Sequence, residues 1–318
     1  MTANPFLTRK SRPLVVGHRG VPRLHQENTL AGFKRAVSLG VPAIELDVRL
    51  TRDGHAVVFH DPDLQRMTGT PRLVSALTWD ELSKLRLRRT IRMGLDTEGS
   101  PVLQQYEREE RIPLFTEVLA EVARDVVINV ELKLDVQRWW PIEIGAIAAK
   151  LIRDAGVEDR VIVTSFDVRK LREANRSHPG LALGFCFDDT MLNFASALLD
   201  RLPPIRARLG FHDRHPNHHA RRLLNRILDS HVIARFLEAR VVGADHTLVG
   251  EDTVTQLHKR GVAIGTHTLY PIGSSTGKAL ARSASTDREV ARLTELGVDW
   301  IESDDPERLL AVMDRVAR

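Results

Sequence analysis

Strand-like and helix-like segments alternate along most of the chain, and this alternation restricts the fold more than any other feature. An apolar run at residues 13–17 is followed by a helical pattern at residues 29–39 and a second apolar run at residues 41–48. After an interruption, the alternation resumes and continues to a final helix that begins at Pro306. Strands that alternate with helices form parallel sheets, so an α/β fold is expected.

The pattern predicts eight strand-helix units, which is the number in a (β/α)8 TIM barrel. The predicted strands lie at residues 13–17, 41–48, 126–134, 161–166, 181–187, 241–244, 262–266 and 300–302. The predicted helices lie at residues 29–39, 114–123, 142–155, 168–177, 252–260 and 287–296, and from residue 306. A doubly wound open sheet is the alternative, but His18-Arg19-Gly20 follows the first strand in place of the glycine-rich dinucleotide fingerprint.

One barrel domain is predicted to span residues 1–318, with insertions at about residues 50–112 and 188–231. The first insertion follows the second strand and contains one short helix at about residues 77–87. With 42% apolar residues, a chain of this length can bury a full core.

Polar side chains gather where the predicted strands end. The carboxyl ends of barrel strands form the mouth at which active sites are found, so these residues are candidates for the site. They are His18, Arg19, Glu45, Asp47, Glu131 and Lys133. Asn28 is predicted to cap the first helix.

The second strand is predicted to continue into a hairpin that brings acidic groups beside a histidine. Glu45 and Asp47 are two residues apart, so they face the same side of a strand. The pair Asp53-Gly54 indicates a tight turn, and a two-residue loop would place Asp47 opposite His60. This arrangement suits a divalent cation and proton transfer, whereas an exposed hairpin with solvated charges is the alternative.

The composition predicts an intracellular protein. Cys186 is the single cysteine, so no disulfide can form within the chain, and no apolar run approaches the roughly 18 residues of a membrane span. Neither a signal peptide nor an anchor is visible at residues 1–13, which leads to the expectation of a cytoplasmic location. The net charge of +4 and the pI near 9.4 suit an anionic substrate but do not require one.

Several short motifs stand out along the chain: His18-Arg19-Gly20, Glu27-Asn28-Thr29, Glu45-Leu46-Asp47, Asp53-Gly54, His60-Asp61 and Glu131-Leu132-Lys133. Taken together, they resemble the motifs of the glycerophosphodiester phosphodiesterases. The resemblance is close in the N-terminal half and fainter as far as Asp304-Asp305-Pro306. The family's fold is a (β/α)8 barrel with a small insertion after the second strand, which agrees with the units counted above.

The resemblance implies that Glu45, Asp47 and Glu131 hold one divalent cation. Carboxylate ligands favour Mg²⁺ or Ca²⁺, and also Mn²⁺, over zinc. The sequence does not choose among these metals.

The resemblance also implies that His18 and His60 exchange acid and base roles, while Arg19 and Lys133 hold the phosphate. In the family's usual scheme one histidine deprotonates the substrate's 2-hydroxyl, which attacks phosphorus, and the other protonates the leaving alcohol. Water then opens the cyclic phosphate. The sequence does not assign the direction of the pair, and a strand-end cap for His18 or a solvated rim position for Lys133 is the structural alternative.

Two departures from the family pattern concern the substrate pocket. The seventh strand ends in His267-Thr268-Leu269-Tyr270, where the family usually has Trp-Thr-Val-Asn, and Trp300 stands where a glycine is usual. We therefore expect His267 and Trp300 to contact the substrate and to alter the polarity and volume of the pocket.

Two further segments allow two interpretations each. The basic, histidine-rich stretch at residues 206–226 could hold a second metal at residues 212–219, but the spacing matches no ligand motif and favours a solvated loop. The glycine- and serine-rich residues 271–286 form either a phosphate-contacting loop or a flexible surface loop.

The leading functional hypothesis is metal-dependent hydrolysis of glycerophosphodiesters to glycerol phosphate and an alcohol. A lysophospholipase D or sphingomyelinase D-like enzyme would need apolar access for a lysolipid, for which Trp139, Trp140 and Trp300 are candidates. A catalytically silent phosphoanion-binding barrel is the third hypothesis, and the presence of both histidines and all three carboxylates argues against it. We expect a small-molecule partner, no nucleic acid and no transmembrane segment, and the oligomeric state is left open.

Overall fold

The computed structural model describes residues 4–133, 143–188, 239–274 and 287–316. The histidine-rich stretch at residues 206–226, the pair Trp139 and Trp140, and most of the glycine- and serine-rich segment lie outside these ranges. No helix in the described ranges is long and apolar enough to cross a membrane.

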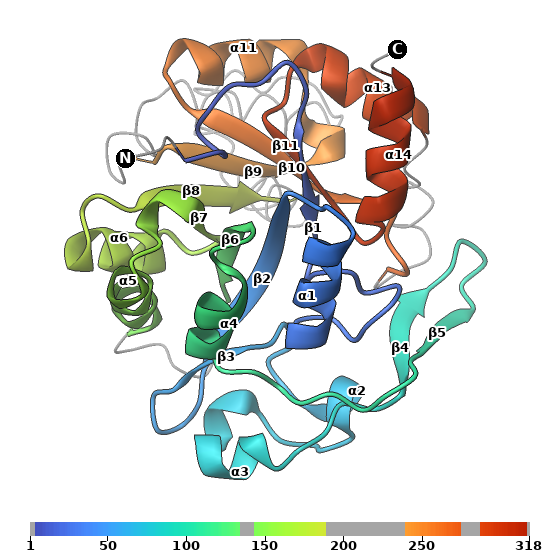
Figure 1. The fold of residues 1–318 in the computed structure, drawn as a ribbon, viewed down its shortest axis with the longest axis vertical. Helices are drawn as coiled ribbons and strands as arrows, with labels where there is room; N and C mark the ends of the chain where they lie inside the picture. Colours follow the sequence, from blue (N-terminus) through green and yellow to red (C-terminus); the bar gives the residue numbers. More distant parts are fainter. Residues whose placement is uncertain (1–3, 134–142, 189–238, 275–286, 317–318) are drawn as a thin grey trace, which may run out of the picture.

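Eight parallel strands close into a barrel, which confirms the predicted fold class. They are β1 (Leu14–Gly17), β2 (Ala43–Leu50), β6 (Val127–Leu132), β7 (Val161–Ser165), β8 (Ala182–Phe187), β9 (Val241–Asp245), β10 (Ala263–Leu269) and β11 (Trp300–Ser303). The ring closes because β1 pairs with β11 on one side and with β2 on the other. Figure 1 shows β1 lying between these two strands.

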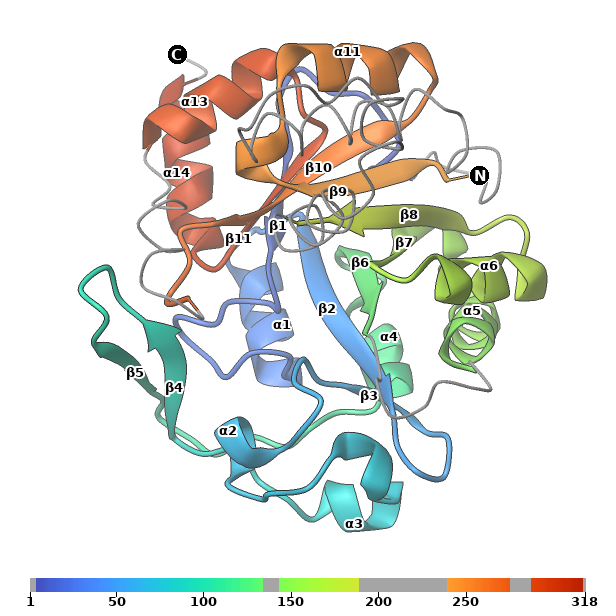
Figure 2. The same ribbon diagram turned by 180° about the vertical axis from the view of Figure 1, so that it is seen from behind.

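Helices surround the strands on the outside of the ring (Figures 1 and 2). They are α1 (Leu30–Ser38), α4 (Phe115–Val122), α5 (Ile144–Ala155), α6 (Val168–Ser177), α11 (Glu251–Lys259), α13 (Asp287–Leu296) and α14 (Pro306–Val316). Their apolar residues recur at helical spacing and pack against the outward-facing strand residues in one large core. Within the described ranges, the short 3-10 helices are η1 (Val74–Ala76), η2 (Glu158–Arg160) and η3 (His246–Leu248).

Thr29, and not Asn28, caps the first helix. The Thr29 hydroxyl accepts a hydrogen bond from the Gly32 amide at 3.1 Å, as an N-cap side chain does. The predicted cap was therefore one residue too early, and the Asn28 side chain is free for the role described below.

The N-terminal end of the barrel interior is a closed apolar core, and Trp300 is its largest residue. Trp300 is the first residue of β11 and is only 1% exposed, with its ring edge-to-face against Phe6 at 5.5 Å. Gly265 makes room for it, because a Cβ atom there would lie 1.7 Å from the indole. The prediction that Trp300 contacts the substrate is therefore wrong, since the start of a barrel strand lies at the end opposite the mouth.

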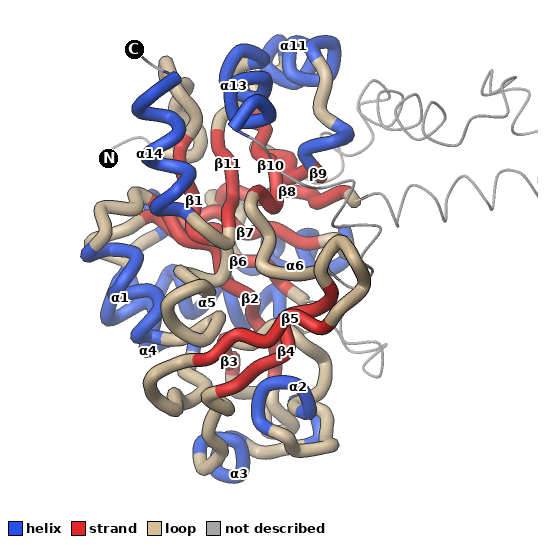
Figure 3. Tube along the Cα trace, turned by 90° about the vertical axis from the view of Figure 1, so that its right-hand side faces the viewer, coloured by secondary structure: helices blue, strands red, loops and turns tan. Residues whose placement is uncertain are grey.

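The insertion after the second strand has its own small core. Besides β3 (Ala56–Val58), it contains α2 (Gln65–Thr68), α3 (Trp79–Ser83) and an antiparallel pair, β4 (Thr90–Leu95) and β5 (Pro101–Gln105). Figure 3 shows these elements gathered beside the barrel. The predicted helix at residues 77–87 is shorter than expected, and the β4–β5 hairpin was not predicted.

The β2–β3 hairpin is shifted by one residue from the predicted register. Val48 pairs with Val58, and the Phe59 amide donates to the Asp47 carbonyl at 2.8 Å, so Phe59 lies opposite Asp47. The shift arises because the loop has three residues, 52–54, closed by a bond from the Thr51 amide to the His55 carbonyl at 3.0 Å. His60 was predicted to lie opposite Asp47, but it follows the residue that does, Phe59.

Candidate active site

A cavity of about 530 Å³ lies at the C-terminal mouth of the barrel, between the strand ends, the insertion and the loop after β10. Its charged and titratable lining residues are His18, Arg19, Glu27, His60, Asp61, Arg66, Arg92 and Asp304. Its neutral lining residues are Pro22, Met93, Gly94, Leu95, Thr268, Pro271, Ile272, Gly273 and Ser274. The cavity thus joins a charged region to a neutral, partly apolar one.

One wall of the cavity forms where the β4–β5 hairpin meets the loop after β10. Leu95 and Ser274 exchange two backbone hydrogen bonds, of 2.8 and 3.2 Å. Gly94 permits this approach, because a Cβ atom there would lie 2.5 Å from the Ser274 carbonyl oxygen and its φ is +128°. The insertion and the last quarter of the described chain therefore enclose the cavity together.

The three carboxylates expected to bind metal lie close together beside the mouth. Glu45 and Asp47 project from β2 on the same side, and Asp47 is paired in register with Glu131 on β6. One oxygen atom from each of the three lies within 4.8 Å of the others. The structure thus brings the predicted ligand set together.

The surroundings of Glu45 fit a bound cation. Glu45 is 2% exposed, and its Oε1 atom has no hydrogen-bond partner among the described residues. Burial, followed by the charges of Asp47, Glu302 and Glu131, raises the pKa of Glu45 well above its usual range. A hard cation with oxygen ligands would satisfy this oxygen and offset the crowding of negative charge.

Two positively charged side chains, Lys133 and Arg19, contact the carboxylate cluster. Lys133 Nζ lies 2.8 Å from an Asp47 oxygen and 2.6 Å from a Glu131 oxygen. Arg19 donates its backbone amide to Glu45 at 2.9 Å, and its Nε lies 3.3 Å from Asp47. Burial alone would raise the pKa of Asp47, but Lys133, His60 and Arg19 hold it well below its usual range. Asp47 therefore carries its negative charge.

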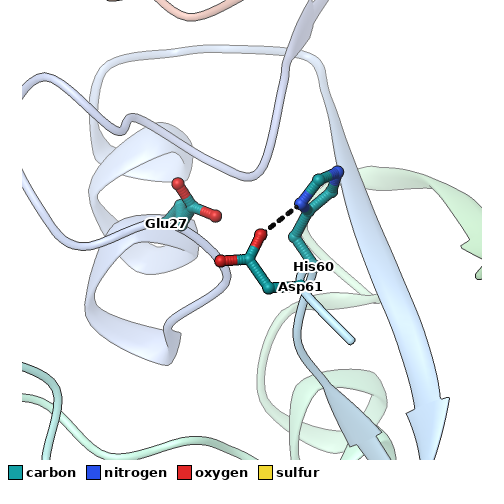
Figure 4. Close-up of side chains that lie close together, drawn as sticks. All are labelled: Glu27, His60 and Asp61. Carbon is teal, nitrogen blue, oxygen red and sulfur yellow. Dashed lines mark hydrogen bonds and ion pairs between the residues drawn. The ribbon is translucent and has the colours of Figure 1, made fainter. Parts of the chain in front are cut away.

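Both predicted catalytic histidines use Nδ1 to bind a carboxylate. His18 Nδ1 lies 2.6 Å from Asp304, and its Nε2 lies 4.0 Å from Glu45. His60 Nδ1 lies 2.8 Å from Asp61, and Figure 4 shows its other nitrogen pointing away from that carboxylate. The carboxylate on Nδ1 fixes each ring and leaves Nε2 for proton transfer.

The environment of His60 favours its neutral form. Burial, together with the nearby positive charges of Arg19 and Lys133, lowers the pKa of His60. A neutral ring with its Nδ1 proton donated to Asp61 has a basic Nε2.

An arginine-centred network holds Asp61 in place. Arg66 binds Asp61 through two nitrogens at 2.6 and 3.1 Å, and it also binds Glu27 at 2.7 and 3.1 Å. Although burial favours the neutral acid, Arg19 and Arg66 lower the pKa of Glu27 to about 2. The group Glu27, His60 and Asp61 in Figure 4 is close enough to bind a metal, but Arg66 already neutralises both carboxylates.

Asn28 is a site residue that the sequence analysis assigned to capping. Its side chain donates to an Asp47 oxygen at 2.7 Å and accepts from the Asp47 amide at 3.2 Å. This bidentate contact needs a left-handed backbone, φ +60° at Asn28, and Arg19 has a similar φ of +55°. The motif Glu27-Asn28-Thr29 was the available signal, because asparagine adopts this conformation more readily than most residues.

Three more residues of the site were not predicted as such: Asp304, Arg66 and Glu27. Asp304 follows β11 and links two parts of the site, because its second oxygen accepts the Ile272 amide at 2.9 Å from the cavity wall. The sequence offered the resemblance at Asp304-Asp305-Pro306 as a signal. The signal for Arg66 was the same resemblance, which includes residues 64–68 of the insertion.

His267 faces the barrel interior near the end of β10, but it is not among the described residues that line the cavity. It is partly buried, its ring lies edge-on to Phe166 at 6.0 Å, and its positive form would favour ionisation of the buried Glu302. Contact with the substrate therefore stays a prediction for His267.

A family model described as the glycerophosphoryl diester phosphodiesterase family matches residues 18–308. The chain belongs to this family and is an enzyme of the glycerophosphodiester phosphodiesterase class. Among curated relatives, a glycerophosphodiester phosphodiesterase of Caldanaerobacter subterraneus is 37% identical over 177 residues, which cover 55% of this chain and 67% of that one. The human protein named lysophospholipase D GDPD1 is 34% identical over 120 residues, or 38% of this chain and 36% of that one.

Solved structures of phosphodiesterases share the fold of this family member. A Silicibacter pomeroyi protein described as a putative glycerophosphoryl diester phosphodiesterase has a TM-score of 0.67 at 22% identity, covering 98% of this chain and 96% of its own. An Oleispira antarctica phosphodiesterase in complex with the product sn-glycerol-3-phosphate has a TM-score of 0.64 at 20% identity, covering 95% and 97%.

Proposed function

We propose that this phosphodiesterase hydrolyses glycerophosphodiesters to glycerol phosphate and an alcohol, with one divalent cation held by Glu45, Asp47 and Glu131. The observation that carries the proposal is the pair of carboxylate-bound histidines, His18 and His60, whose Nε2 atoms are left for proton transfer beside the carboxylate cluster. A cation bound there would draw charge from the phosphate oxygens and help to orient the diester.

The histidines divide the proton transfers. One Nε2 takes the proton of the substrate's 2-hydroxyl as that oxygen bonds to phosphorus, and the other protonates the oxygen of the leaving alcohol as its bond to phosphorus breaks. Addition of water to the cyclic phosphate then reverses the two roles and yields glycerol phosphate. Each histidine thereby returns to its starting protonation state.

Arg19 and Lys133 prepare the site for an anion. Both lie against the carboxylates and have raised pKa values: burial opposes their charge, but the acidic neighbours outweigh it. They remain charged and are placed to hold phosphate oxygens once the diester occupies the cavity. Fixed charges of this kind need little reorganisation when the transition state forms.

The test is release of phosphomonoester from a panel of glycerophosphodiesters with Mg²⁺, Ca²⁺, Mn²⁺ or a chelator. We expect hydrolysis that chelation abolishes and added metal restores. Hydrolysis that resists exhaustive chelation would overturn the cation requirement, and no hydrolysis with any metal would overturn the function.

A lysolipid phosphodiesterase is the second candidate, and the apolar part of the cavity favours it. Pro22, Met93, Leu95 and Ile272 line that part, whereas Trp300, expected to help form an apolar opening, is buried at the far end of the barrel. Lysolipids included in the same panel separate the two candidates by their kcat/KM values.

A further inference from the structure

Arg92 lies in β4 of the insertion and lines the same cavity as His18 and His60. We propose that Arg92 forms a subsite for a second negative charge, so that the enzyme prefers glycerophosphodiesters whose alcohol carries a carboxylate or phosphate. This inference rests on the proposed function and specifies the substrate class.

The charge balance of the cavity singles out Arg92. Arg19 is paired with Glu27 and Asp47, and Arg66 is paired with Glu27 and Asp61. Arg92 is exposed and makes no ion pair or side-chain hydrogen bond with any residue in the described ranges. No described residue therefore competes with a ligand for its guanidinium.

The neighbour of Arg92 in β4 contacts the network that positions His60. The adjacent Met93 lies with its sulfur 4.0 Å from Arg66 Nη1, and Arg66 holds Asp61, which in turn binds His60. The hairpin cannot swing freely, because Leu95 in the same strand is hydrogen-bonded to Ser274. Arg92 is thus held beside the outer part of the cavity.

The cavity that both histidines and Arg92 line has room for the alcohol group. Its volume of about 530 Å³ is typical of pockets that enclose ligands larger than glycerol phosphate. The lining residues next to Arg92 in the hairpin, Met93, Gly94 and Leu95, bear no charge. They offer no carboxylate to compete for the guanidinium.

The chemistry of arginine suits this role. A guanidinium donates two parallel hydrogen bonds to a carboxylate or a phosphate, a geometry that an ammonium group cannot reproduce. Since Arg92 is exposed, water and salt screen the interaction, and we expect a preference of about tenfold.

The experiment compares kcat/KM for two matched substrate pairs. Glycerophosphoserine differs from glycerophosphoethanolamine by one carboxylate, and glycerophosphoinositol 4-phosphate differs from glycerophosphoinositol by one phosphate. In Arg92→Gln we expect a loss of about tenfold for the more anionic member and about twofold for its partner. Arg92→Glu should disfavour the anionic members further, and Arg92→Lys should restore part of the preference.

Arg86→Gln is the matched control, because Arg86 is an exposed arginine of the same insertion that does not line the cavity. It should leave both ratios unchanged. The preference of the parent enzyme should also shrink as salt rises from about 20 to 200 mM, a readout that needs no variant to fold.

The outcomes separate this subsite from the proposed function. If Arg92→Gln abolishes the preference for the more anionic substrate in both pairs, the result supports a general anion subsite. If it abolishes the preference in one pair only, the result identifies the carboxylate or the phosphate as the ligand. If the substrates are hydrolysed but neither the Arg92 substitutions nor added salt changes the kcat/KM ratios, the subsite is overturned and the proposed function stands. If no substrate is hydrolysed, the proposed function fails and the subsite falls with it.

Discussion

The two ends of the barrel interior are built from the same strands but hold opposite kinds of side chain. In β2, Ala43 packs in the apolar N-terminal end, while Asp47 lies in the carboxylate cluster near the mouth. In β11, Trp300 fills the N-terminal end, and Asp304, just after the strand, binds His18. Close packing of apolar side chains stabilises the N-terminal end. At the mouth, ion pairs between buried side chains take the place of their hydration. Stability and chemistry are thus assigned to different ends of one core.

The backbone shows the same division. Within the described ranges, the non-glycine residues with left-handed φ are Arg19, Asn28 and Tyr270. All three lie in connections that follow β1 or β10, on the side of the mouth. Left-handed conformations are strained for residues other than glycine and are often found at functional sites. Their position at the mouth therefore agrees with a functional role for this end.

The largest effect on activity is expected for Asp47→Ala at the mouth. It removes one of the three proposed cation ligands and the partner of Lys133 and Asn28, so we expect activity to fall by more than about 10,000-fold. Calorimetric titration should show loss of metal binding while circular dichroism shows a folded barrel. Asp80→Ala, at an exposed aspartate in α3, is the control and should retain activity. Full activity in Asp47→Ala would refute the assigned cluster.

The next largest effect is expected for His18→Ala and His60→Ala. Loss of one proton-transfer group should lower kcat by about 100- to 10,000-fold while metal still binds. His55→Ala is a matched control, because His55 also lies beside a carboxylate, Asp53 at 3.3 Å, but does not line the cavity. Lost metal binding in the His60 variant would make His60 a ligand instead of a catalyst.

The opposite end should respond in stability. Trp300→Ala leaves a cavity in the apolar core, so the free energy of unfolding should fall by about 3–5 kcal/mol. Val316→Ala, at a side chain that is 42% exposed, should lose less than about 0.5 kcal/mol. The activity per folded molecule of the Trp300 variant should stay close to that of the parent, and a specific loss of kcat would show that the two ends are coupled.

Asp61→Asn tests how much the carboxylate that positions His60 contributes to kcat. The change keeps the shape of the side chain but weakens its bonds to His60 and Arg66, so kcat should fall by about 10- to 100-fold. Metal affinity and KM should hardly change, and Asp80→Asn should have no effect. Equal losses in kcat and thermal stability would instead indicate a structural role.

The smallest effect is expected for His267→Trp. Because His267 packs against Phe166 and does not line the described cavity, the shift in preference among choline, ethanolamine, inositol and lysolipid substrates should be about 1 kcal/mol. Comparison of the four kcat/KM values measures this shift. A common factor for all four, or no change, would exclude His267 from selectivity.

Local sequence patterns predicted the barrel well, because each strand and helix carries its own periodicity. The range of α6 was predicted to the residue, and the other helices of the barrel were located within a few residues. The β4–β5 hairpin was missed because the alternation in β4 is short and breaks at Gly94, where the pairing with β5 shifts register. The register of β2 and β3 was missed because a three-residue loop, closed by Thr51, replaces the expected two-residue turn.

The candidate site was predictable where residues stand at strand ends and less so where they act through other residues. Strand alternation predicted that Glu45 and Asp47 face the same side, and the resemblance to the family added Glu131, which the structure pairs in register with Asp47. Arg66 was not, because its contact with Asp61 depends on how the insertion folds. Trp300 was assigned to the pocket because it stands where the family usually has a glycine. Its position at the start of a strand instead places it at the end opposite the mouth.

The contact between His18 and Asp304 has a consequence for how the protein is made. The first strand leaves the ribosome early, but Asp304 follows the last strand, and β1 can close the barrel only when β11 is present. Contacts between such distant parts of a chain form late and slow the folding. The proposed activity should therefore be absent from every nascent chain that lacks β11, and its appearance would report that β11 has been made and the barrel has closed.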